Sequence, residues 1–149
     1  MKREYIAIPI EGTLVKLEEV PESTFASGTL GAGFAIKFTG KQLMSPISGT
    51  VIATFPTGHA FIVRREDGLE LMIHVGINSA KKPEAFRAQV KKYQQVTQGQ
   101  VLTLVDPKMF PEGVNYCPVV FSLPEIEVIL AKEGQQVTPM QEDAVRIAY

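Results

Sequence analysis

This chain has little cysteine, no tryptophan and no long apolar run, and each scarcity excludes a class of protein. The 149 residues include one cysteine, Cys117. A single cysteine cannot form an internal disulfide, which fits a reducing compartment. No apolar run approaches the roughly 20 residues that a membrane-spanning helix needs, so no membrane insertion is expected. Only a few apolar residues separate the charged start, Met1–Glu4, from Pro9, so we expect no signal peptide and a cytoplasmic protein.

The chain also lacks an excess of charge of either sign. Lysine and arginine total 15, aspartate and glutamate total 16, and the net charge is −1. This balance does not indicate binding to nucleic acid or to an anionic membrane surface. With no linker or low-complexity stretch, the length predicts one domain over residues 1–149.

Glycine and proline, twelve and ten residues respectively, interrupt the sequence too often for long helices. Between them lie short runs rich in β-branched residues, and this spacing predicts an all-β, single-domain antiparallel β-sandwich or barrel-like fold. One short helix is predicted near residues 83–93, where Phe86, Val90 and Tyr93 recur with helical period after Pro83. The predicted strands are Thr13–Val15, Gly33–Phe38, Thr50–Phe55, His59–Val63, Leu69–Val75, Val101–Val105, Pro118–Phe121 and Val145–Ala148.

A near-repeat indicates internal two-fold character. The segment Pro9–Val15 (PIEGTLV) matches Pro46–Ile52 (PISGTVI), and a fainter match joins Gln94–Thr97 to Gln135–Thr138, both QQVT. Each segment has the composition of a turn followed by a strand. We therefore expect the same local structure to occur twice within one β core.

The chain has only two histidines, and a predicted hairpin brings them together. His59 begins one apolar run and His74 ends the next, with Asp67-Gly68, a strong hairpin signal, between them. A two-residue loop would pair His74 with Phe61, and a four-residue loop would pair His59 with His74. Both registers place the imidazoles on one face, roughly 5 to 8 Å apart at Cβ, whereas a loop of odd length would separate them.

In either register, strand alternation also places Phe61, Val63, Met72 and Glu70 on the face of the histidines. Paired imidazoles suit three chemistries: metal binding, which for zinc normally needs a third protein ligand, acid–base catalysis, or nucleophilic catalysis by a neutral ring nitrogen. An apolar rim of Met72 and Phe61 would suit a macromolecular partner better than a small polar substrate. A half-buried structural pair is the alternative without function.

The residues around the histidines resemble those of a known family. Thr57-Gly58-His59-Ala60 resembles a Thr-x-His-Ala motif, and Gly68-Leu69-Glu70 followed by His74-Val75-Gly76-Ile77 resembles Gly-x-Glu and His-x-Gly-Ile-Asp motifs. These motifs belong to the glucose-type enzyme IIA of the bacterial phosphoenolpyruvate-dependent sugar phosphotransferase system. Further similar segments keep the family's order over roughly residues 5–148: Val20-Pro21-Glu22, Phe25-Ala26, Gly31–Ile36, Ser45–Thr50 and Cys117–Val120.

The resemblance implies a phosphocarrier that supports sugar uptake without a cofactor or metal. By similarity, His74 accepts a phosphoryl group on Nε2 from the carrier protein HPr and passes it to a cysteine of the enzyme IIB domain of a sugar permease. His59 stabilises the phosphoryl group as a donor, the segment at Thr57 orients His59, and the backbone of Gly76 orients His74. A monomer is the expected state.

The resemblance also implies a partner-binding surface, to which it assigns Phe25, Phe55, Met72, Val75, Glu22 and Asn78. This chain departs from the family at Asn78 and Glu22, where the family has aspartate, and at Ala32, where an aspartate is lost. It also has Pro83-Glu84-Ala85-Phe86 in place of a Gly-x-Gly-Phe segment. The loss of formal charge predicts weaker electrostatic steering of a basic partner.

Two other functions remain open from the sequence. A divergent member could be a regulatory module that binds proteins according to its phosphorylation state and serves no permease of its own. Transfer to an enzyme IIB cysteine separates that function from a carrier. A zinc hydrolase is the second alternative, and it requires a third ligand that the sequence does not supply near the histidine pair.

Overall fold

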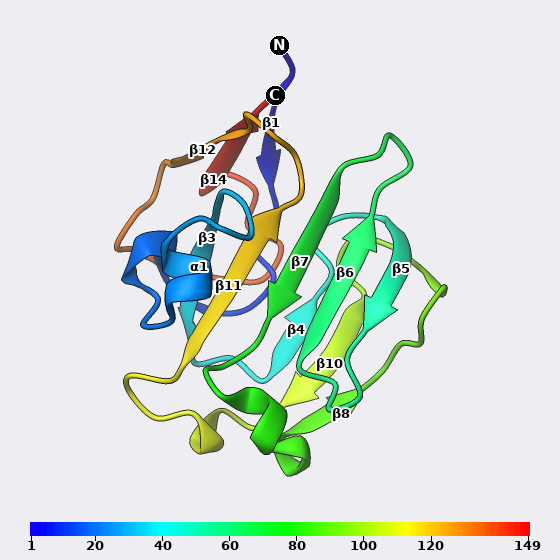
Figure 1. The fold of residues 1–149 in the computed structure, drawn as a ribbon, viewed down its shortest axis with the longest axis vertical. Helices are drawn as coiled ribbons and strands as arrows, with labels where there is room; N and C mark the ends of the chain where they lie inside the picture. Colours follow the sequence, from blue (N-terminus) through cyan, green and yellow to red (C-terminus); the bar gives the residue numbers. More distant parts are fainter.

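A twisted eight-stranded antiparallel sheet forms the centre of the protein, for which a computed structural model describes residues 1–149 (Figure 1). Its strand order is β13-β2-β3-β11-β7-β6-β5-β9. The strands are β2 (Gly12–Lys16), β3 (Gly33–Phe38), β5 (Gly49–Thr54), β6 (Ala60–Arg64), β7 (Glu70–His74), β9 (Gln95–Val96), β11 (Tyr116–Phe121) and β13 (Gln136–Val137).

Two three-stranded antiparallel sheets complete the β structure. One has the order β1-β14-β12, and the other has the order β4-β10-β8. Their strands are β1 (Arg3–Ile6), β14 (Val145–Ala148), β12 (Glu127–Leu130), β4 (Gln42–Met44), β10 (Val101–Val105) and β8 (Phe86–Ala88). All strand pairs are antiparallel and no sheet closes on itself, which confirms the predicted all-β sandwich class.

The one short α-helix lies elsewhere than predicted. It is α1 (Ser23–Ala26), and the predicted helix over residues 83–93 is wrong. That segment begins with the 3₁₀ turn η3 (Pro83–Ala85) and continues as β8. Phe86 and Val90 are buried as the helical pattern requires, but Tyr93 is exposed and has a left-handed backbone. The other 3₁₀ turns are η1 (Leu17–Glu19), η2 (Ser79–Lys81) and η4 (Pro107–Met109). No helix is long and apolar enough to span a bilayer.

The predicted strands are all present, three of them with the predicted bounds: β3, β10 and β14. Their apolar and β-branched side chains suit a pleated, half-buried surface. The strands outside the eight predicted runs are two to four residues long: β1, β4, β8, β9, β12 and β13. Such segments are too short to show a two-residue period, and they become strands because they pair with other strands in the folded protein.

The predicted repeat is confirmed in the hydrogen bonding. Gly12 and Gly49 start β2 and β5, and the two QQVT segments form β13 and β9. The backbone amide of Leu14 donates to the carbonyl of Gln135 at 3.0 Å, and in the other copy Val51 donates to Gln94 at 2.9 Å. A Cβ at either glycine would overlap the neighbouring strand's backbone, which explains why both copies keep glycine at this point.

The predicted register of the β6–β7 hairpin is wrong, because the loop has an odd length. Arg65 donates its amide to the carbonyl of Leu69 at 2.7 Å, which leaves the three residues Glu66–Gly68 in the loop. Gly68 has φ +96°, as in a type I turn followed by a left-handed residue. Consequently Ala60 lies opposite His74, one position away from both predicted pairings.

This register sends the two predicted rim residues to opposite faces of the sheet. Phe61 is fully buried in the main core, beside Leu71 and Ile73, whereas Met72 and His74 face the other side. On that second side, η1 and α1 cover the sheet and form a smaller apolar cluster that includes Leu17 and Phe25 (Figure 1). The open end of the β6–β7 hairpin points down in Figure 1, toward the turns that follow β7.

Candidate functional site

The two histidines meet at the open end of the β6–β7 hairpin. Their ring centroids lie 4.9 Å apart, and the rings are nearly perpendicular, at 79°. His74 is the last residue of β7, and His59 lies in the bend before β6. The prediction that the hairpin brings the pair together is therefore confirmed, although the register that motivated it is wrong.

His59 reaches His74 because it precedes the regular strand. Gly58 before it has φ +79°, and the carbonyl of His59 accepts the amide of Val75 at 2.8 Å. The side chain of a residue in a bend is not bound by the alternation that governs a strand. Its ring lies against Phe55, with centroids 5.6 Å apart, and Phe86, at 6.2 Å.

The electrostatic environment keeps both imidazoles neutral near pH 7. Burial, together with the nearby His59, lowers the pKa of His74 to about 4, and the backbone of Gly76 opposes the shift. Burial also lowers the pKa of His59. The Nδ1 atoms of both rings are buried and make no hydrogen bond of normal geometry. We therefore regard the influence of Gly76 on His74 as a weak polar contact rather than a formed hydrogen bond.

The surroundings of His74 restrict which ring nitrogen can react. Its ring lies 5.2 Å from the Phe25 ring, centroid to centroid, and its side chain is only partly buried. Because Nδ1 is buried, Nε2 is the nitrogen open to a partner. A neutral imidazole with an accessible Nε2 lone pair can act as a nucleophile, and the second ring beside it can donate a hydrogen bond to an incoming group.

Thr57, whose segment the resemblance implies would orient His59, makes no hydrogen bond to either histidine ring. The Thr57 hydroxyl donates instead to the carbonyl of Ala80, at 3.4 Å. This contact joins the segment before His59 to the turn after His74.

Gly76 has φ +85°, and a Cβ there would overlap the ring of Phe110. Only glycine combines this conformation with this space.

The predicted partner-binding residues divide by exposure. Phe55 is 39% exposed and Met72 is partly exposed, so both side chains are accessible. Val75 is fully buried and Phe25 is 3% exposed, so neither side chain is available to a partner in this structure. The physical reason is that Val75 faces the main core, while Phe25 of α1 packs over the sheet against His74.

Glu22 and Asn78 lie where α1 and η2 begin. Glu22 is half-buried and accepts a hydrogen bond from the hydroxyl of Thr24, at 3.3 Å. Asn78 is exposed, with φ 57°, a conformation that asparagine tolerates better than most residues. Ala32, the third departure from the family pattern, is exposed just before β3.

Sequence reasoning missed two residues of the site, Phe86 and Ser79. Phe86 was assigned to a helix, but β8 carries its ring to His59. Ser79 is 1% exposed, and its hydroxyl donates to the carbonyl of Gly76 at 3.1 Å. No sequence signal distinguishes a serine of this kind from one on the surface.

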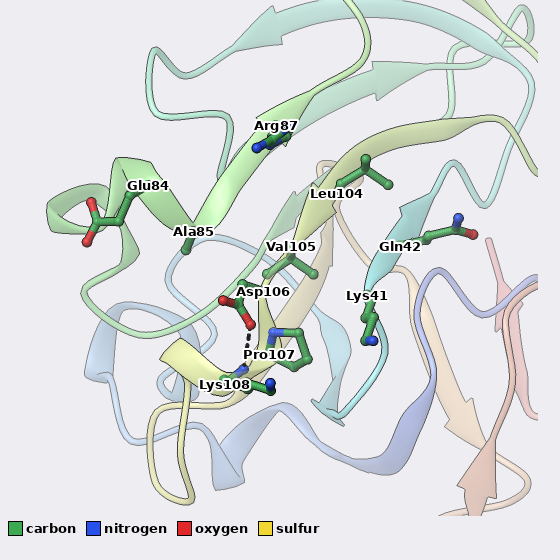
Figure 2. Close-up of a pocket in the computed structure, with 10 residues that line it drawn as sticks. All are labelled: Lys41, Gln42, Glu84, Ala85, Arg87, Leu104, Val105, Asp106, Pro107 and Lys108. Carbon is green, nitrogen blue, oxygen red and sulfur yellow. Dashed lines mark hydrogen bonds between the residues drawn. The ribbon is translucent and has the colours of Figure 1, made fainter.

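An open hollow of about 610 Å³ lies on the outer face of the β4-β10-β8 sheet (Figure 2). Figure 2 shows Leu104 between Gln42 and Arg87, with a hydrogen bond from the amide of Lys108 to the carboxylate of Asp106, 3.1 Å long. Neither histidine lines this hollow. The candidate site is the histidine pair, and no group of three or more His, Cys, Asp or Glu side chains suited to a metal ion is present.

Comparison with known proteins shows the family of this chain. Residues 4–123 match the family described as phosphoenolpyruvate-dependent sugar phosphotransferase system, EIIA 1. The chain is 33% identical over 138 residues to a glucose-specific EIIA component of Halalkalibacterium halodurans, which covers 92% of this chain and 80% of that protein. It is similar in structure to the glucose permease IIA of Mycoplasma capricolum, with a TM-score of 0.82 and 29% identity over 99% of this chain and 96% of the other.

Some relatives are much longer proteins. The chain is 42% identical over 104 residues to a glucose-specific EIIBCA component of Corynebacterium glutamicum, which is 69% of this chain but only 15% of that protein. With the fold, the paired imidazoles and the matched family in agreement, the chain belongs to the EIIA 1 family of the phosphoenolpyruvate-dependent sugar phosphotransferase system and has the role of a phosphocarrier.

Proposed function

We propose that His74 is the residue that carries the phosphoryl group, on Nε2. The observation that supports this most is the neutral ring of His74, with Nδ1 buried and Nε2 on the open side, 4.9 Å from a second imidazole by ring centroids. The Nε2 lone pair forms the new N–P bond while the N–P bond of the donor phosphohistidine breaks. The lowered pKa keeps the ring neutral near pH 7, and in the tautomer with its proton on Nδ1 no proton has to leave Nε2 first.

In this proposal His59 stabilises the phosphoryl oxygens rather than accepting the group itself. Its ring is 6% exposed and enclosed by Phe55 and Phe86, so it is less accessible than His74. A donor held rigidly beside the transferred group stabilises developing charge without reorganising. Thr57 would support His59 indirectly, through its contact with Ala80.

The proposed partners are HPr as the donor and a cysteine of an enzyme IIB domain as the acceptor. Relatives that join EIIA with EIIB and EIIC parts in one protein support the second partner. The relatives are named for different sugars, including glucose, mannose and N-acetylglucosamine, so we assign sugar choice to the permease. We further propose that residues 1–149 act as one monomeric domain in the cytoplasm, with Phe55 and Met72 on the docking surface, Glu22 and Asn78 at its edge, and Phe25 and Val75 supporting it from beneath.

The test is phosphoryl transfer from phosphoenolpyruvate through enzyme I and HPr to the wild type, His74→Ala and His59→Ala. We expect phosphohistidine on the wild type and on His59→Ala, and none on His74→Ala. Circular dichroism checks that each variant is folded. Phosphorylation of folded His74→Ala at the wild-type level would contradict the proposal.

A second measurement separates the carrier from a regulatory module. Phosphorylated protein is mixed with an enzyme IIB domain, and the label on the IIB cysteine is followed. Transfer from the wild type, with slower transfer from His59→Ala, is expected for a carrier. A stable phosphoprotein that gives no label to any IIB domain of its host would favour the regulatory alternative.

A further inference from the structure

The ring of His59 is oriented by the rings packed against it. Its Nδ1 is buried without a hydrogen-bond partner, and the residue is 6% exposed. The torsion that sets the plane of a histidine ring has broad preferences, so the side chain does not fix this plane by itself. The rings that lie against it are those of Phe55, Phe86 and His74. These neighbours therefore set the direction in which His59 can offer a hydrogen bond.

Phe86 is the neighbour of His59 that the fold holds most firmly. It is 7% exposed, whereas Phe55 is 39% exposed. Phe86 is the first residue of β8, where it pairs with Val105 of β10. Its ring centroid lies 6.2 Å from that of His59, with the planes tilted by 53°. This separation is within the range in which aromatic rings attract one another, so Phe86 forms the rigid side of the contact.

Strand β8 also supports the backbone that carries His59. The bend before His59 contains Gly58, which has φ +79°. A Cβ at Gly58 would lie 3.3 Å from Cβ of Ala88 and 3.6 Å from Cβ of Phe86. The bend therefore packs directly on β8, and the same strand contacts both the main chain before His59 and the His59 ring.

A second buried ring connects Phe86 with the segment of His74. The ring of Phe110, a residue that is 3% exposed, lies 5.6 Å from that of Phe86, centroid to centroid. Phe110 also fills the space beside Gly76, where a Cβ would overlap its ring. The segments of the two histidines therefore rest on one pair of buried phenylalanine rings.

We propose that Phe86 is a positioning residue for phosphoryl transfer: its ring fixes the plane of the His59 imidazole beside the phosphoryl group on His74. This inference rests on the proposed functions of the two histidines. In onward transfer the N–P bond to His74 breaks as the sulfur of the enzyme IIB cysteine bonds to phosphorus. A donor stabilises the charge on the phosphoryl oxygens best when it is already in place. A smaller side chain at position 86 would leave a gap into which the His59 ring could turn.

Phe86→Leu tests the proposal, with Phe38→Leu as the matched control. Phe38 is 2% exposed, and its ring lies 5.5 Å from that of Phe110, almost as the ring of Phe86 does. Of the two, only Phe86 packs against His59. Phe86→Met is a second variant if leucine prevents folding. The readouts are nuclear Overhauser contacts between the ring protons of the two histidines in the unphosphorylated protein, the rate of transfer to an enzyme IIB cysteine, and the melting temperature.

We expect both leucine variants to lower the melting temperature, but only Phe86→Leu to weaken the contacts between the histidine rings. Phe86→Leu should reproduce the effect of His59→Ala on a smaller scale. His74 should still become phosphorylated, and transfer to the IIB cysteine should slow by on the order of tenfold. In a His59→Ala background, Phe86→Leu should cause no further slowing, because the ring that it positions is gone.

Unchanged ring contacts and transfer in folded Phe86→Leu, or in Phe86→Met where leucine prevents folding, would overturn the inference. Equal slowing by Phe38→Leu would overturn it too, as would a further slowing in the His59→Ala background. The contacts between the rings are measured without phosphorylation. Failure of the wild type to accept a phosphoryl group would therefore contradict only the proposed function.

Discussion

The polar side chains at the two ends of the β6–β7 hairpin differ in how many hydrogen-bond partners they have. At the open end, His59 and His74 have buried Nδ1 atoms without hydrogen-bond partners. At the turn, Arg65 contacts both carboxylate oxygens of Glu4, at 2.5 and 2.8 Å, and both of Asp67, at 3.0 and 2.9 Å. The hydroxyl of Tyr149 completes this cluster, accepting from Arg65 and donating to Glu4.

The pKa values reflect this difference. Burial lowers the pKa of both histidines because no partner compensates the cost of charge. At the turn, hydrogen bonds from Arg65 lower the pKa values of Glu4 and Asp67, and those carboxylates raise the pKa of Arg65. At one end of the hairpin the imidazoles stay neutral because their buried Nδ1 atoms have no partners, and at the other end hydrogen bonds join the hairpin to residues near the chain termini.

Arg65→Ala should have the largest effect on stability. It leaves the partly buried Glu4 carboxylate without its main partner, so we expect a loss of about 3 kcal/mol in the free energy of unfolding. The initial rate of phosphorylation of the folded protein should stay within a factor of two. Urea unfolding and the transfer assay measure the two quantities. His74→Ala is the reverse control, because it should abolish transfer with little loss of stability. If Arg65→Ala slows transfer as strongly as His74→Ala, the two ends of the hairpin do not have separate roles.

As the pH is lowered, the open end of the hairpin should lose stability at a higher pH than the turn does. The pKa of His74 is lowered from its ordinary value of 6.5 to about 4, so the unfolded state binds more protons between these values. Stability is then fully present above pH 6.5 and is lost as the pH falls toward 4, by on the order of 3 kcal/mol.

Urea unfolding at pH 7, 5.5 and 4 measures this loss. A double variant, His59→Gln with His74→Gln, should lose much less stability over the same range, since the other acidic groups with shifted pKa values, Glu4, Asp67 and Asp143, all have pKa values below their ordinary range. An equal loss in the double variant would show that the histidines do not cause the acid sensitivity.

Tyr149→Phe should have a smaller effect, confined to the turn. The variant removes one hydroxyl that bonds Arg65 and Glu4, each at 2.9 Å, and keeps the ring. We expect a loss of about 1 kcal/mol, because Arg65 still pairs with both carboxylates. Thermal unfolding measures the change, and an effect as large as that of Arg65→Ala would show that the cluster depends on its tyrosine.

Arg64→Ala should have the smallest effect and serves as the control for Arg65→Ala. Arg64 pairs with Glu70 across the hairpin at 2.9 Å, but its side chain is 55% exposed. Exposed pairs of this kind contribute about 0.5 kcal/mol or less. If Arg64→Ala lowers the free energy of unfolding as much as Arg65→Ala, the greater burial of Arg65 does not make its ion pairs more stabilising.

Much of the fold could be predicted from local sequence. The runs Gly33–Phe38 and Val101–Val105 are strands with the predicted bounds, and the QQVT segments pair as equivalent strands. The segment 83–93 could not be predicted in this way, because Phe86 and Val90 occupy buried sites on non-helical backbone that mimic a helical period. The helix α1 is a single turn, too short to produce a periodic signal.

The sequence by itself indicated the histidine pair as the candidate site, since the only two histidines flank a hairpin and lie in recognisable motifs. Tertiary structure decided how the pair meets. A three-residue loop ending at Gly68 set a register that local signals do not determine, and the bend at Gly58 freed His59 from strand alternation. Burial of Phe25 and the contact of Phe86 with His59 likewise depend on distant segments folding together. Local patterns specify which residues prefer a strand or turn, whereas packing between separated segments specifies which side chains touch.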